Sequence, residues 1–126
     1  MTNRTPFSWK KRAASFRYAF QGLRRFFATE HNAWIHLGAA GFVLAAGIGF
    51  HLQPWEWAAV FLSIAMVLSA EAFNTCVERT MDLVSMERRD DIRYIKDLAA
   101  GAVLLSALAA AAVGLLVFIP HLHTLF

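Results

Sequence analysis

Three long apolar segments follow one another along this chain of 126 residues, separated by short polar stretches. The first, at 32–52, contains no Asp, Glu, Lys or Arg, and the other two cover 55–77 and 98–119. About 20 apolar residues suffice for a helix to cross a hydrocarbon core of about 30 Å. The pattern therefore predicts an all-α membrane protein with three transmembrane helices. Pro54 suits the start of the second helix, and Pro120 is expected to end the third.

The N-terminal region has a different pattern. Residues 1–12 are polar and basic, and we expect them to form a loose tail. Within 13–29, four large apolar side chains recur at spacings of three and four residues: Phe16, Phe20, Leu23 and Phe27. This spacing is typical of an amphipathic helix, here with basic residues on its other faces. We expect the helix to lie in the membrane interface, although a helix packed on a soluble partner would show the same pattern.

Composition and charge agree with a small membrane protein of one domain. The chain is 58% hydrophobic, above the 45–50% or so that is usual for soluble domains. All 12 Lys and Arg residues lie in two stretches, one ending at Arg25 and the other running from Arg79 to Lys96. The positive-inside rule places both stretches in the cytoplasm. We therefore expect a multi-pass protein of the plasma or inner membrane, with its N-terminus in the cytoplasm and its C-terminus on the outer side. A nucleic-acid partner is not expected, because the adjoining apolar segments explain the basic tail.

A polar stripe begins at the end of the second apolar segment. Its members are separated by three, four and four residues: Glu71, Asn74, Glu78 and Asp82. In a helix these side chains fall within about 80° of arc. A carboxylate at membrane depth costs about 2.5–3.5 kcal/mol on insertion scales. The stripe is therefore a candidate functional site.

The chemistry that these residue types permit is phosphoryl transfer. In an antiparallel bundle the polar ends of the three segments meet at one depth. There, Glu30 and Glu78 offer oxygen ligands for Mg²⁺ carried by a nucleotide, and Lys96 offers a cation for phosphate. Glu71, the deepest acid, could accept a proton from a lipid alcohol. The chain has no GxxxxGK[ST] motif, so a P-loop is absent.

Several of these residues also have a purely structural interpretation. Asp82 could be a solvated acid at a helix end, and Asn74 could form a hydrogen bond between helices. We expect His36 to be a structural hydrogen-bonding residue rather than a ligand. Glu71 is the hardest to explain by solvation alone. His121 and His123 are expected to lie at the opposite side of the membrane, without a role.

The same residues resemble the signature of a known family, the prokaryotic diacylglycerol kinases. The resemblance covers about Phe16 to Phe118. It is carried by EAFNTCVERTMD at 71–82, by KDLAAGAV at 96–103, by Tyr18-x-x-x-Gly22-Leu23 and by Glu30-x-Asn32-x-x-x-His36.

The resemblance implies a small integral-membrane kinase, a homotrimer with active sites shared between subunits. Such an enzyme transfers the γ-phosphate of ATP to a membrane lipid hydroxyl with Mg²⁺. By the same resemblance Glu71 is the general base, and Glu30 and Glu78 are metal ligands at the nucleotide. Further roles follow for nucleotide contacts and for support of the site: Tyr18, Lys96 and Asp97 for the first, and Asn74, Asn32 and Asp82 for the second.

The acceptor lipid and the reaction class each have an alternative. Asn74-Thr75, the Asn32 and His36 pair and the run at 99–103 look more like the undecaprenol kinase branch than the diacylglycerol branch. Ile95 stands where the family often has Ala. The segment at 87–93 is variable, so it stays open whether this loop contacts the nucleotide. A small proton-coupled transporter that uses Glu71, or a scaffold without catalysis, would also fit three spans. Nucleotide binding would separate the kinase from both.

Overall fold

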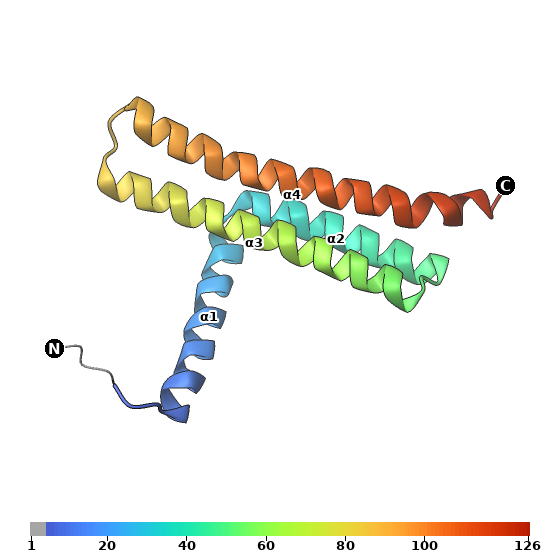
Figure 1. Cartoon of the computed structure of the whole chain (residues 1–126), viewed down its shortest axis with the longest axis horizontal. Helices are drawn as coiled ribbons and strands as arrows, with labels where there is room; N and C mark the ends of the chain where they lie inside the picture. The colour runs from blue at the N-terminus through green and yellow to red at the C-terminus, as the bar shows by residue number, and fades with distance from the viewer. Residues whose placement is uncertain (1–4) are drawn as a thin grey trace. The chain divides into compact units, whose positions relative to one another are not determined.

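The computed structural model describes residues 5–126, and these form helices joined by short turns (Figure 1). The helices run in chain order: α1 (Trp9–Thr29), α2 (His31–Phe50), α3 (Pro54–Val84) and α4 (Asp90–His123). The all-α prediction is confirmed, and α2, α3 and α4 are long and apolar enough to cross a membrane. The chain divides into two compact units, of which the second is Asn32–Phe126. Each unit is described by itself.

Helix α1 begins earlier than the sequence predicted. Ser8 is in an extended conformation, and the helix starts at Trp9 rather than at residue 13. Lys and Arg have good helix propensities, so the basic residues that follow Trp9 continue the helix instead of forming a loose tail. Residues 1–4 of the expected tail lie outside the described part of the chain. At the other end, the Glu30 amide donates to the Phe26 carbonyl at 3.0 Å and closes the last turn.

A tight turn joins α2 to α3. His51 has a positive φ of 55°, and the next amide, that of Leu52, donates to the Gly47 carbonyl at 3.2 Å. Helix α3 then starts at Pro54, as predicted. The side chain of Glu56 accepts a hydrogen bond of 2.7 Å from the Gln53 amide and completes a capping box, which satisfies amide groups left open at a helix start.

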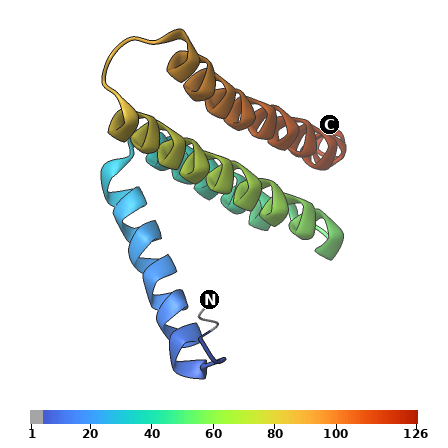
Figure 2. The same ribbon diagram turned by 60° about the vertical axis from the view of Figure 1, so that its left-hand side comes forward.

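Helices α3 and α4 form an antiparallel hairpin, and both Figure 1 and Figure 2 show them side by side. Both helices extend beyond the predicted apolar segments, because α3 continues to Val84 and α4 begins at Asp90. Acidic residues in the first turn of α4 suit the positive end of its helix dipole. The connecting loop covers residues 85–89.

The expectation that Pro120 ends the third transmembrane helix was wrong. Pro120 lies inside α4, which continues to His123. A proline removes one amide donor, but here only the last helical turn follows it. That turn is held by Thr124, whose amide and hydroxyl both donate to the carbonyl of His121.

The best-packed part of the second unit lies near the α2–α3 turn. Its buried core consists of Leu52, Val60 and Val117, one from the turn and one from each helix of the hairpin. Gly47 allows close approach here, because a Cβ atom at this position would lie 2.7 Å from the Trp57 ring. Further along, small side chains of α2, α3 and α4 leave a cavity of about 290 Å³. Most other large apolar side chains face outward, as expected for helices in contact with lipid.

Candidate active site

The polar stripe of α3 starts with a buried carboxylate that is paired with a histidine. Glu71 is only 5% exposed, and its Oε1 lies 2.9 Å from Nε2 of His36 on α2. The histidine is one-quarter exposed at its side chain. Because an unpaired carboxylate at membrane depth is costly, this contact stabilises Glu71 in the bundle and fixes the direction of one of its oxygens. His36 thus has a defined partner.

One turn further along the stripe, an amide and a carboxylate are paired. Asn74 is buried, and its Nδ2 donates to Oε1 of Glu78 at 3.3 Å. Its other polar atom, Oδ1, is buried without a hydrogen-bond partner among the described residues. Glu78 itself is exposed. An orphaned acceptor beside an exposed carboxylate is suited to a ligand that brings a donor or a cation.

The last member of the stripe holds the lysine that the sequence singled out. Oδ1 of Asp82 lies 2.6 Å from Nζ of Lys96 on α4, and both side chains are partly exposed. Asp97, the next residue, is 3.7 Å from Arg93 and largely exposed. Asp82 is therefore more than a solvated acid, because it positions the ammonium group of Lys96 at the entrance of α4.

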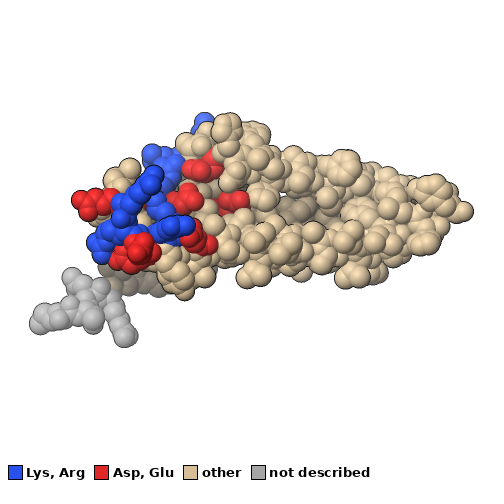
Figure 3. Space-filling model, turned by 90° about the horizontal axis from the view of Figure 1, so that it is seen from above, with Lys and Arg blue, Asp and Glu red and all other residues tan. Residues whose placement is uncertain are grey.

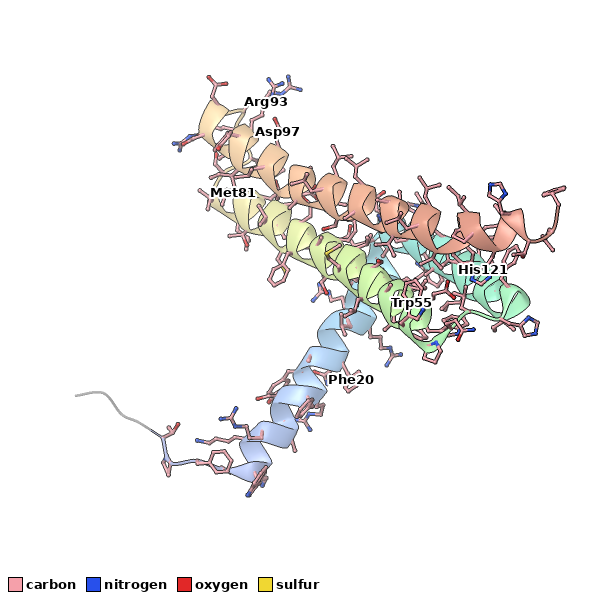
Figure 4. The ribbon with its side chains drawn as sticks, turned by 45° about the vertical axis from the view of Figure 1, so that its right-hand side comes forward. Phe20, Trp55, Met81, Arg93, Asp97 and His121 are labelled. Atoms are coloured by element: carbon pink, nitrogen blue, oxygen red, sulfur yellow. The ribbon has the colours of Figure 1, made fainter. Side chains whose placement is uncertain are left out.

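A polar cleft of about 600 Å³ opens beside this ion pair, at the α3–α4 loop. Asp82, Lys96 and Asp97 line it together with three guanidinium groups: Arg88, Arg89 and Arg93. Figure 3 shows Lys, Arg, Asp and Glu side chains gathered at this end of the bundle, while the opposite end is almost free of them on that face. In Figure 4, Arg93 and Asp97 mark the same end of α4. Arginine and lysine side chains can bind phosphate oxygens, and four carboxylates of the lining balance their charge in this cleft.

Three predicted site residues lie neither on the stripe nor in the lining of the cleft. Asn32 is exposed at the start of α2. Tyr18 and Glu30 belong to the first unit. The Tyr18 ring is 61% exposed and lies 5.4 Å from the Arg17 guanidinium, and a Glu30 oxygen lies 3.4 Å from the Thr29 hydroxyl. The roles of these three residues stay predictions.

The oxygen atoms of the polar stripe decide whether a divalent metal can bind there. Residues 5–126 contain no group of three or more His, Cys, Asp or Glu side chains arranged to hold a metal ion. The exposed carboxylate of Glu78 and the unpartnered Oδ1 of Asn74 are nevertheless the hard oxygen donors that Mg²⁺ prefers. Mg²⁺ usually binds through one or two carboxylates plus nucleotide phosphates, so this donor set fits a metal delivered with ATP.

Sequence reasoning missed a second buried glutamate–histidine pair, which lies at the opposite end of the hairpin. Glu56 is 5% exposed, and Nε2 of His121 lies 3.0 Å from both of its carboxylate oxygens. Figure 4 shows His121 at the same end of the bundle as Trp55. Glu56, one turn into a helix that is otherwise apolar as far as Glu71, was the available signal. It needed the spatial closeness of His121, 65 residues away in the chain, to be interpreted.

Comparison with known proteins identifies the group to which this arrangement belongs. The family model described as prokaryotic diacylglycerol kinase matches residues 17–118. The chain belongs to this family. It is 38% identical over 108 residues to the undecaprenol kinase of Bacillus subtilis (strain 168). The matched region covers 86% of this chain and 88% of that relative. It is also 38% identical over 112 residues to the diacylglycerol kinase of Synechocystis sp., covering 88% of this chain but only 64% of that relative.

Membership of the prokaryotic diacylglycerol kinase family confirms the resemblance and the expectation of a lipid kinase. The matched residues agree with the predicted extent of about 16–118. With three helices able to span a bilayer, the chain is a membrane protein. The buried pair of Glu71 and His36 lies within the matched region.

Proposed function

We propose that this family member transfers the γ-phosphate of ATP to the hydroxyl group of undecaprenol, with Glu71 as general base. The observation that carries the proposal is the state of Glu71. It is a buried carboxylate on a helix long enough to span the membrane, and its Oε1 lies 2.9 Å from Nε2 of His36. A carboxylate in this setting is suited to accept a proton from an alcohol that reaches it from the lipid.

The nucleotide would bind toward the outer end of the stripe. The polar cleft at the α3–α4 loop offers Lys96 and three arginines to phosphate oxygens. Glu78, seven residues from Glu71, lies about 10.5 Å further along the helix axis, between the base and the cleft. This spacing leaves room for a phosphoryl group and an attacking hydroxyl between the two carboxylates.

The proposed reaction is a single in-line displacement. The lipid oxygen attacks the γ-phosphorus, the bond from that phosphorus to the β,γ-bridging oxygen breaks, and the hydroxyl proton passes to Glu71. The products are a lipid monophosphate and ADP. Glu78 and Asn74 would hold Mg²⁺, which when bound neutralises charge on the phosphates. Glu30 is proposed as a second metal ligand and Tyr18 as a nucleotide contact.

Undecaprenol is proposed as the acceptor for two reasons. The Asn74-Thr75 sequence and the Asn32 and His36 pair resemble the undecaprenol branch of the family more than the diacylglycerol branch. In addition, the undecaprenol kinase from B. subtilis is matched over 88% of its length, whereas the diacylglycerol kinase from Synechocystis is matched over 64%. Diacylglycerol is the second candidate.

We also propose that the active enzyme is a homotrimer and that its N-terminus and α3–α4 loop face the cytoplasm. The basic residues of the N-terminal region and of the loop support this orientation, which brings the polar cleft to the side where ATP is available.

The test is phosphorylation by labelled ATP of undecaprenol, diacylglycerol and ceramide, each offered to the full chain in vesicles. We expect the undecaprenol product to predominate. Glu71→Gln should lower kcat by about 10²- to 10⁴-fold, the range for loss of a general base. Glu56→Gln is the matched control, because it changes a buried glutamate of the same helix away from the proposed site. It should keep its turnover per folded molecule.

His36 provides a second, graded test. His36→Gln keeps a side-chain donor that can reach Glu71, whereas His36→Leu removes it. A hydrogen bond to a charged group contributes about 1.5–3 kcal/mol, so the leucine variant should lose roughly 10- to 100-fold in kcat and the glutamine variant clearly less.

Full activity of Glu71→Gln would refute its role as base. ATP-independent proton transport that depends on Glu71 would support the transporter instead.

A further inference from the structure

Helix α1 has a one-sided charge. Between Trp9 and Thr29 it contains six basic residues and no acidic residue: Lys10, Lys11, Arg12, Arg17, Arg24 and Arg25. Most surface helices mix both signs, since charges of opposite sign three or four residues apart stabilise each other. Six uncompensated cations within 21 residues repel one another unless an anionic partner is present.

Three of the cations form a row along the helix. Lys10, Arg17 and Arg24 are separated by seven residues, so each lies about 20° around the helix axis from the one before it. The rise between neighbours is about 10.5 Å. All three side chains are exposed, and no carboxylate pairs with them among the described residues. The one contact found for this row is the Arg17 guanidinium over the Tyr18 ring.

The row borders an exposed apolar face. The residue before each of the three cations is Trp9, Phe16 or Leu23, which places the cations about 100° around the helix from the apolar side chains. Trp9 is 79% exposed and Phe16 is 69% exposed, and Phe20, labelled in Figure 4, projects from the helix between them and Leu23. Water covers such a face poorly, whereas the boundary between lipid headgroups and acyl chains accommodates it.

We propose that the row formed by Lys10, Arg17 and Arg24 binds the phosphate groups of anionic phospholipids while the apolar face enters the acyl-chain boundary. Lys and Arg side chains are long enough to reach the headgroup layer from a helix lying at this depth. The charge complementarity selects an anionic membrane surface over a zwitterionic one. Lys11 and Arg25 lie on the far side of the helix, about 160–200° from Trp9, and would face water. This inference concerns α1 alone and stands whether or not the chain phosphorylates undecaprenol.

The experiment measures amide hydrogen exchange in the full chain. The wild-type protein is placed in nanodiscs of phosphatidylcholine alone or of phosphatidylcholine with phosphatidylglycerol, and the protection of residues 9–29 is compared. Each cation near an anionic surface shifts docking by roughly fivefold, so removal of two should lower the phosphatidylglycerol-dependent protection by about 25-fold. Added salt should weaken the same effect, because it screens exposed charges.

Two variants of equal net charge make the test specific. Arg17→Gln with Arg24→Gln removes two members of the row, and Lys11→Gln with Arg25→Gln removes two cations from the far side. We expect the first pair to abolish most of the dependence on phosphatidylglycerol and the second to retain most of it. Equal losses in both pairs would overturn the row and leave only a net-charge effect. Equal protection of the wild-type chain in both membranes would overturn anionic binding.

Discussion

The hydrogen-bonded pair of Glu56 and His121 joins the first turn of α3 to the last turn of α4, and its removal should loosen that end of the hairpin. His121→Phe removes the hydrogen-bonding nitrogen but keeps a ring beside Phe50, whose centroid lies 5.9 Å from the imidazole. Glu56→Gln removes the charge but keeps an oxygen that can accept from the Gln53 amide. Both substitutions therefore isolate the contact at 3.0 Å between the two side chains.

The size of the effect follows from three competing magnitudes. Removing one partner of a deeply buried pair costs about 3–5 kcal/mol. Hydrogen bonds to charged groups contribute about 1.5–3 kcal/mol, whereas hydrogen bonds between membrane helices average about 0.6 and reach about 1.7 kcal/mol. Glu56 keeps its hydrogen bond to Gln53 when His121 is changed, so the largest value does not apply. The coupling energy should be about 1.5 kcal/mol, equivalent to a little over tenfold in the folding equilibrium.

A double-mutant cycle measures this coupling. The four proteins, wild type, His121→Phe, Glu56→Gln and the double variant, are unfolded reversibly in mixed micelles, and their free energies of unfolding are compared. The loss in the double variant should be smaller than the sum of the single losses by about 1.5 kcal/mol. Additive losses within about 0.5 kcal/mol would refute the reasoning, because the two side chains would then act independently.

Two further predictions concern packing and charge elsewhere in the second unit. Gly47→Ala should destabilise the fold, because its Cβ would lie 2.7 Å from the Trp57 ring, whereas Gly41→Ala meets nothing within 4 Å and should be neutral or gain up to about 1 kcal/mol of helix propensity. Equal thermal stabilities of the two variants would contradict the close contact. Asp82→Asn should change the free energy of unfolding by less than about 1 kcal/mol, because the exposed side chains of Asp82 and Lys96 are screened by water. Denaturant titration would check this, and a loss well above that value would mean that the pair is shielded in the assembled enzyme.

The helices could be predicted because their signals are local. Long apolar runs predicted the three helices that could span a membrane, and Pro54 predicted the start of α3. The ends of α4 were harder, because helix formation there depends on neighbours rather than on hydropathy. Acidic residues extend its start into the charged loop, and a contact with Glu56 holds the turn that follows Pro120.

The candidate site was partly predictable for a similar reason. The spacing of the four stripe residues predicted that they share one face of a helix. The structure adds a side-chain partner for each residue, and among the described residues the Oδ1 atom of Asn74 has no hydrogen-bond partner. Those partners could not be derived from spacing. The pairing of Asp82 with Lys96 depends on the turn between α3 and α4, and the partner of Glu71 depends on which face α2 presents to α3.

The length of α3 has a consequence for how two unlike substrates can meet. Its 31 residues extend about 46 Å, whereas the apolar layer of a bilayer is about 30 Å thick. Counted from Pro54, Glu71 lies about 26 Å along the axis and Asp82 about 42 Å. If α3 crosses the membrane from Pro54, its polar stripe begins within the hydrocarbon core and ends in water. A water-insoluble alcohol need not leave its layer, and a highly charged nucleotide need not enter it.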